Sequence, residues 1–160
     1  MTVSALSAAR TLGELRDWTL SNLEIQKILY LAHMYHLGRT GQPLINEAFE
    51  AWDYGPVVPE VYGRAKGTGS APIRPSAFSW YVPVMPGTTE FNILKDAADG
   101  LKGVRPGHLV DLTHRKGGAW ADNYRNGVRG IKIPNHDIYR EYWNFAAPND
   151  PGAPATRPWG

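Results

Sequence analysis

Apolar side chains recur at helical spacing after Ser21, and this pattern predicts the main element of the chain. The positions that form the apolar face are Ile25, Ile28, Leu29 and Ala32. Ser21 and Glu24 have the spacing of a capping box, in which each side chain bonds the other residue's backbone N–H. We therefore predict an amphipathic helix with a broad buried face that begins at Ser21 and ends near Gly38.

Shorter helical patterns follow later in the chain. Apolar periodicity with capping residues and prolines predicts helices over about 57–65, 89–101, 106–114 and 135–145, with a helical turn around Trp120 and Tyr124. Residues 131–133 read as a small extended piece. The first 16 residues are small and polar and show at best a weak helical tendency. The pattern is that of a mainly helical protein.

The segment 50–62 combines aromatic residues with turn and helix-start signals. Trp52 and Tyr54 are large apolar side chains with polar groups, a type that anchors cores and interfaces. Gly55-Pro56 predicts a change of chain direction. Pro59-Glu60 suits the first turn of a helix, because proline lacks only a donor that has no partner there. We predict an extended arm, a sharp turn and a helix, with Trp52 and Tyr54 supporting the fold.

A proline-rich stretch, residues 70–89, changes the character of the chain. Its prolines interrupt any helix, while its aromatic and β-branched residues favour a strand or hairpin. A loop with this many apolar side chains is either packed on its own domain or available to a partner.

Composition fits one cytoplasmic domain. The chain has 160 residues, no cysteine and a net charge of +2, with its basic residues scattered. These features exclude disulfides and Cys-ligated zinc, and they disfavour nucleic acid as a partner. The chain comprises an N-terminal segment (1–20), one domain (21–147) and a flexible tail (148–160). Neither a signal peptide nor a membrane span is apparent.

No residue pattern predicts a catalytic, cofactor or metal site. His33 and His36 lie three residues apart, but two ligands do not make a metal site, and we expect one packed and one surface histidine. Asp111 and His114 have the same spacing, which suits either an oriented general base or a surface pair near a helix end. The basic, glycine-rich stretches at 66–69 and 115–118 match no phosphate-binding loop and suit helix ends.

Several segments, in order, resemble the Panacea domain of SocA-like antitoxins, a family that includes phage-associated proteins of the GepA type. They are Leu23-Glu-Ile-Gln-Lys-Ile-Leu-Tyr-Leu-Ala-His33, residues 35–44, residues 51–62, and Leu109-Val-Asp-Leu-Thr-His114 followed by Trp120. The family-motif residues we single out are Trp52, Tyr54, Gly55, Pro56, Thr113, His114 and Trp120. Ala119 stands where the family usually has proline, and residues 70–89 have no clear counterpart.

The resemblance implies a compact single-domain helical bundle, mainly α with a small β component. It also implies a non-enzymatic antitoxin that binds a cognate toxin encoded by an adjacent gene. One family member also delivers its toxin to the ClpXP protease, a role that the motifs do not carry over to this chain. The residues we expect to contact the partner lie outside the periodic helical faces: Arg64, Lys66, Phe78, Trp80 and Tyr81. Two alternatives stay open: a small hydrolase that uses Asp111 and His114, with His33 as a further candidate, and a nucleic-acid-binding autoregulator.

Overall fold

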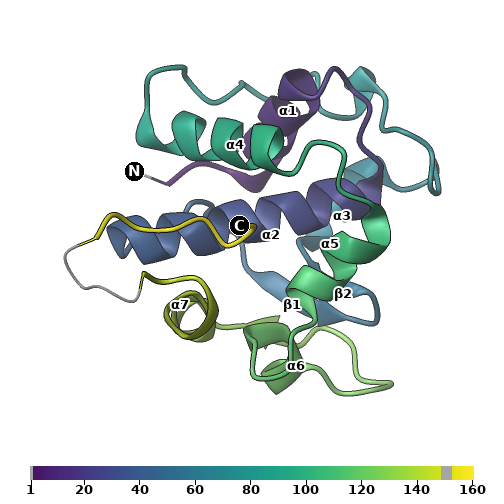
Figure 1. Ribbon diagram of the computed structural model, residues 1–160. Coiled ribbons are helices and arrows are strands. Elements are labelled where there is room, and N and C mark those ends of the chain that lie inside the picture. The colour runs from purple at the N-terminus through teal and green to yellow at the C-terminus, as the bar shows by residue number, and fades with distance from the viewer. Residues whose placement is uncertain (1, 149–152) are drawn as a thin grey trace.

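The computed structural model describes residues 2–148 and 153–160, and these form a mainly helical protein with a small sheet (Figure 1). The helices are α1 (Ala5–Leu15), α2 (Asn22–Thr40), α3 (Pro59–Ala65), α4 (Thr89–Gly100), α5 (Pro106–Thr113), α6 (Ala119–Asn123) and α7 (Asn135–Phe145), with a 3-10 turn η1 (Pro75–Ala77). The strands are β1 (Phe49–Trp52), β2 (Gly55–Val57) and β3 (Lys132–Ile133). The predicted fold class is confirmed.

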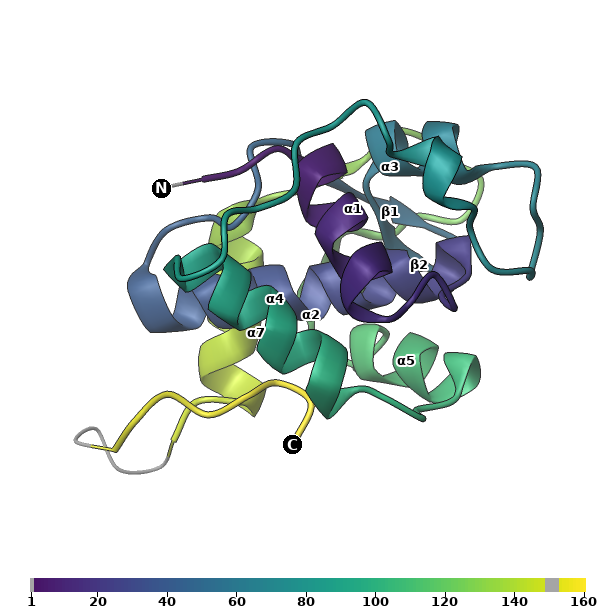
Figure 2. The ribbon, with the colours of Figure 1, turned by 90° about the horizontal axis from the view of Figure 1, so that it is seen from above.

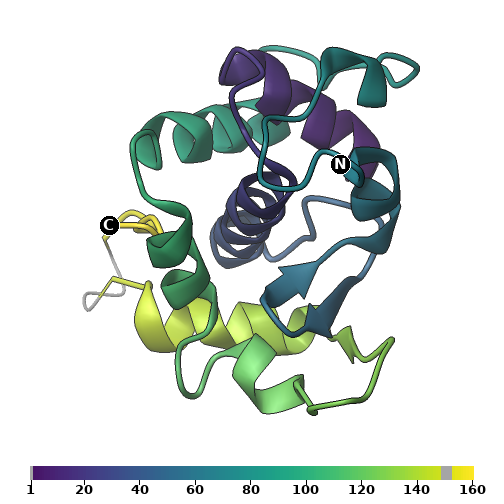
Figure 3. The same cartoon turned by 90° about the vertical axis from the view of Figure 1, so that its right-hand side faces the viewer.

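Helix α2 forms the centre of the molecule. Figure 3 shows it nearly end-on, ringed by the other elements, and it contacts α1, α3, α4, α5, α7 and β2. The capping box predicted at its start is present: Ser21 Oγ accepts from Glu24 N, and Glu24 Oε1 accepts from Ser21 N. The predicted single buried face is wrong, because α2 is buried on all sides from Ile25 to Leu37. Its polar side chains therefore need partners inside the protein.

The N-terminal segment is part of the same core. Residues 5–15 form helix α1, which lies with α4 on one side of α2, whereas the sequence predicted little helix here (Figure 1). The helix begins where Ser4 Oγ accepts from Ser7 N, and its inner face is made of Ala5, Ala8, Ala9 and Leu12, all fully buried. Alanine side chains give a weak hydrophobic signal in sequence, but their small size lets two helices approach closely. Helix α1 thus packs on the same core as the rest of the protein, while the domain boundary at residue 20 stays a prediction.

The sheet has the order β2-β1-β3, with both pairs antiparallel. The chain reverses at Asp53-Tyr54, so the prediction of a turn at Gly55-Pro56 is wrong by two residues, and these two belong to β2. Gly55 has φ +115°, a backbone conformation that side-chain-bearing residues rarely adopt. The predicted helix after this hairpin is confirmed as α3, with Pro59 in its first turn and Glu60 beside it.

The loop between α3 and α4 contains no strand among its described residues, which corrects the predicted strand or hairpin. Instead, η1 and irregular chain run along α1 (Figure 2). Arg10 Nη1 donates to the carbonyls of Ser79 (3.1 Å) and Tyr81 (2.6 Å). Thr11 Oγ1 accepts from Val84 N at 2.8 Å. The prolines of this loop prevent regular strand pairing, so side chains of α1 serve as hydrogen-bond partners for its backbone groups.

The end of the chain also makes tertiary contacts. The Trp159 ring meets the Tyr35 ring edge-on, with 5.5 Å between their centroids, and Arg157 pairs with Asp96 at 3.0 Å. The sequence predicted a flexible tail over 148–160, and its residues 149–152 lie outside the described residues. The contacts of Trp159 and Arg157 were not anticipated, while the domain boundary at residue 147 stays a prediction.

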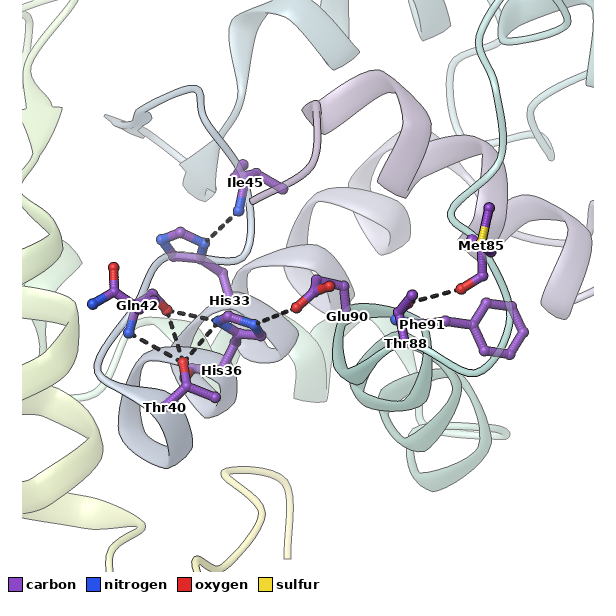
Figure 4. A network of polar contacts seen from close by, with 9 residues as sticks. All are labelled: His33, His36, Thr40, Gln42, Ile45, Met85, Thr88, Glu90 and Phe91. Carbon is purple, nitrogen blue, oxygen red and sulfur yellow. Dashed lines mark hydrogen bonds and ion pairs between the residues drawn. The ribbon is translucent and has the colours of Figure 1, made fainter. Parts of the chain in front are cut away.

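Both histidines of α2 are buried, which corrects the expectation that one is at the surface (Figure 4). His33 Nε2 lies 2.8 Å from Asn135 Oδ1, and His33 Nδ1 accepts from Ile45 N. These contacts fit the neutral ring with its proton on Nε2, and burial lowers the pKa of His33 to about 4. His36 lies 2.6 Å from the Gln42 carbonyl and 3.3 Å from Glu90. The two histidines thus join α2 to its neighbours.

The part of the chain that the structure describes shows neither a metal-ligating cluster nor a membrane-spanning helix. No group of three or more potential metal-ligating side chains occurs there. No helix in this part of the chain is long and apolar enough to cross a bilayer.

Candidate binding surface

Side chains of α2 hold the hairpin from one side. Lys27 Nζ donates to the Pro56 carbonyl at 3.0 Å, and Gln26 Oε1 accepts from Val58 N at 2.8 Å. Because β2 is an edge strand, its outward backbone groups would otherwise lack partners. Two adjacent residues of the family-like segment 23–33 therefore secure the family-like segment 51–62.

The last family-like segment, residues 109–114 followed by Trp120, holds the hairpin from another direction. Trp120 Nε1 donates to the Trp52 carbonyl at 2.7 Å. The Trp120 ring stacks on two other rings. The distance between ring centroids is 3.7 Å to His114, with an interplanar angle of 9°, and 4.6 Å to Tyr124, with an interplanar angle of 19°. The Tyr124 hydroxyl donates to Asp53 in the hairpin turn. Three segments distant in sequence therefore converge on residues 52–58.

Gly55 lies where these supports meet. A Cβ atom at Gly55 would lie 2.9 Å from Lys27 Cε and 3.1 Å from His114 Nε2. Glycine is therefore required at this position for two reasons: its positive φ and the lack of space for a side chain. Thr113, the residue before His114, is buried, and its hydroxyl donates to carbonyls of its own helix. The motif residues Gly55, Thr113 and His114 are thus explained by packing.

The possible catalytic pair is not assembled. Asp111 is exposed, and within the described part of the chain its carboxylate makes no hydrogen bond to His114. The His114 ring is instead stacked on Trp120, and its Nε2 is buried without a hydrogen-bond partner among the described residues. Desolvation, followed by the nearby Lys27 charge, lowers the pKa of His114. His33 belongs to a separate buried network. This geometry offers no oriented general base.

Lys27 provides a test of this arrangement through pH. Burial lowers its pKa from 10.5 to about 7. Between these values the unfolded chain binds more protons than the folded one, so the free energy of unfolding rises with pH. From pH 7 to 9 we expect the wild type to gain about 2 kcal/mol, at most 1.4 kcal/mol per pH unit. Lys27→Met should remove most of this rise in urea unfolding curves measured at each pH.

The matched control for this prediction is Lys102→Met, which removes an exposed lysine. It should keep the slope of the wild type. A Lys27→Met variant with an unchanged slope would show that Lys27 has an ordinary pKa in the folded protein.

A groove of about 960 Å³ opens beside the hairpin. One part of its lining is aromatic: the rings of Trp52 and Tyr62 meet edge-on, with 4.8 Å between their centroids. Trp52 is half-buried, as a supporting residue should be, but Tyr54 is 72% exposed, so the prediction that it supports the fold is wrong. The Tyr54 side chain lines the groove instead.

The predicted partner-contact residues separate into two groups. Phe78 is fully buried and stacks on Trp18, so it cannot touch a partner, and this prediction is wrong. Trp80 is 86% exposed. Arg64 lies over the half-buried Tyr81 ring, with its Cζ 5.5 Å from the ring centroid, and Lys66 is exposed at the groove.

Sequence reasoning missed two apolar residues beside Trp80. Val82 is 76% exposed and Met85 is 72% exposed. We call Trp80, Val82 and Met85 the loop patch. The residues between these exposed side chains are held by the protein: Val84 is buried, and the Tyr81 carbonyl accepts a hydrogen bond from Arg10. Spacing alone could have suggested Val82, two residues after Trp80, but nothing in the sequence says which residues of the loop face inward.

A family model and a known relative both relate this chain to SocA-like antitoxins. Residues 25–121 match the model of the family described as "Antitoxin SocA-like, Panacea domain". The chain is also similar to Antitoxin SocA of Caulobacter vibrioides (strain NA1000 / CB15N), with 34% identity over 124 residues, covering 69% of this chain and 63% of that protein. It therefore spans less than two thirds of the length of this relative. No solved structure matches. The matched range contains α3, the hairpin, the loop patch and the groove lining from Gln26 to Ser70.

Proposed function

Because this chain belongs to the SocA-like antitoxin family with a Panacea domain, we propose that it neutralises a toxin by binding the toxin protein directly. The observation that carries the proposal is the family match over residues 25–121, together with 34% identity to an antitoxin. The partner is the product of an adjacent gene, and both proteins act in the cytoplasm. Neutralisation occurs by covering a functional surface of the toxin and needs no chemistry from this chain.

The loop patch and α3 supply the contact surface in this proposal. Trp80, Val82 and Met85 expose large apolar areas, and aromatic and arginine residues dominate the energetics of most interfaces. Arg10 and Thr11 fix the backbone of this loop. A surface that is already ordered loses less conformational entropy on binding, which favours affinity.

Co-expression tests the proposal. The neighbouring gene should stop growth when expressed alone, and growth should recover when this chain is expressed with it. The two proteins should then co-purify. A neighbouring product that is harmless alone, or that stays toxic beside a well-expressed antitoxin, would refute the proposal.

The same assay in cells without ClpXP separates two modes of neutralisation. Direct covering of the toxin predicts full recovery of growth without the protease. Recovery that depends on ClpXP would assign this chain an adaptor role instead.

A further inference from the structure

The groove beside the hairpin has charges that the fold does not use. Lys66 directly follows α3, and Arg129 lies in the loop before β3; both line the groove, and both are exposed. Neither makes an ion pair or a side-chain hydrogen bond with any residue in the described ranges 2–148 and 153–160. Lys27, also in the lining, uses one of its donors on the Pro56 carbonyl.

The acidic residues of the groove are engaged within the protein. Glu50 Oε1 accepts from Trp52 Nε1 at 3.0 Å. Asp53 accepts from the Tyr124 hydroxyl. Both carboxylates keep their negative charge, because their donors are neutral, but they already have hydrogen-bond partners within the protein. The cations of Lys66 and Arg129 have no such partner among the described residues, so an acidic group placed beside them would form ion pairs that the fold does not already make.

The groove also accepts apolar groups. Trp52 and Tyr62 form an aromatic part of its lining, and the Tyr54 ring is 72% exposed beside them. Rigid aromatic side chains next to arginine and lysine bind peptides well, because little side-chain freedom is lost on contact. A volume of about 960 Å³ accommodates several residues of an extended chain rather than one small group.

Helix α3 connects this groove to the loop patch. Tyr62 of α3 and Lys66 just after the helix line the groove, while Arg64 of α3 covers Tyr81 in the loop. Figure 3 shows α3 between the hairpin and the loop that carries η1. A partner bound on the loop patch can therefore extend a segment into the groove without leaving the surface.

We propose that the groove holds an extended segment of the toxin that places an acidic side chain at Lys66 and Arg129 and an apolar side chain against Trp52 and Tyr62. This inference rests on the proposed function, because it names the part of the toxin that is recognised. The apolar loop patch provides affinity, and the groove selects the partner by charge.

The test measures the affinity of the purified toxin for variants of the full chain. Lys66→Glu combined with Arg129→Glu should weaken binding at least ten-fold at low salt, and the difference from wild type should shrink as salt rises. The matched control is Lys102→Glu with Arg105→Glu, which makes the same charge change at exposed positions outside the groove lining. It should change the affinity less than two-fold. Replacing the recognised acid of the toxin by lysine should restore binding to the doubly reversed variant.

Glu50→Gln distinguishes an acidic segment from a basic one. The acidic segment predicts unchanged or tighter binding, and a ten-fold loss would mean that the groove takes a basic segment and overturn the inference. Equal losses of toxin affinity in the groove and control variants would overturn the inference too. It would also be overturned if the wild type self-associates and the groove variant does not, because the groove would then bind a second copy of this chain. Unchanged binding by the groove variant, with binding lost in Trp80→Ala, would leave the proposed function standing and refute only the groove. A wild type that binds no toxin would refute both.

Discussion

Replacing Glu141 with alanine is expected to destabilise the protein by about 3–5 kcal/mol. Glu141 Oε1 accepts from the Tyr30 hydroxyl at 2.7 Å and from Ala119 N at 3.0 Å, and its Oε2 lies 3.6 Å from Arg115 Nη2. The carboxylate is completely buried, and burial raises its pKa. Alanine would leave a buried hydroxyl and a buried amide without their acceptor and the Arg115 guanidinium without its counter-charge, which costs more than the original contacts are worth.

Urea unfolding at neutral pH measures this effect. Glu141→Gln keeps an acceptor for Tyr30 and Ala119 but loses the charge, so it should fall between the wild type and the alanine variant. Glu14→Ala is the control, because Glu14 makes only an exposed pair with Arg10. It should cost less than about 1 kcal/mol. An equally small loss in Glu141→Ala would mean that water or rearranged side chains replace the carboxylate.

Trp80→Ala is expected to abolish toxin neutralisation while leaving the fold unchanged. The side chain is 86% exposed, so its removal should shift the free energy of unfolding by less than about 0.5 kcal/mol. If Trp80 is the central contact of the loop patch, truncation should cost about 2 kcal/mol or more of binding energy, roughly a 30-fold loss of affinity. Growth during co-expression and the affinity for purified toxin both report this loss.

The control for this experiment is Trp143→Ala on α7. Trp143 is 49% exposed but lies outside the loop patch and the groove lining. The Trp143→Ala variant should therefore neutralise the toxin as well as the wild type does. Full neutralisation by Trp80→Ala would place the main contact elsewhere, and a Trp52→Ala variant that folds but no longer binds would move it to the hairpin.

The elements with strong local signals were predictable. The capping box at Ser21 and the helix start at Pro59 both appear where the sequence indicated. Each depends on contacts between residues at most a few positions apart. Helix α1 was missed for the opposite reason, because its stability depends on packing by small alanine side chains that carry little hydrophobic signal.

The candidate surface was predicted only in part. Trp80, Arg64 and Lys66 are exposed as expected, but Phe78, two residues before Trp80, fills the core. In an irregular loop no periodicity relates one side chain's direction to the next. The direction is set by tertiary contacts, here the bonds from Arg10 to the loop carbonyls.

The sequence by itself determined the helical class and the segments that mark the family, since both reside in local residue order. Tertiary structure decided what those segments do for one another. Lys27, Pro56 and Trp120 are far apart in the chain, yet they meet at one hairpin and leave a groove beside it. Such convergence depends on how elements pack around α2, and no local pattern encodes which buried polar group will meet which partner.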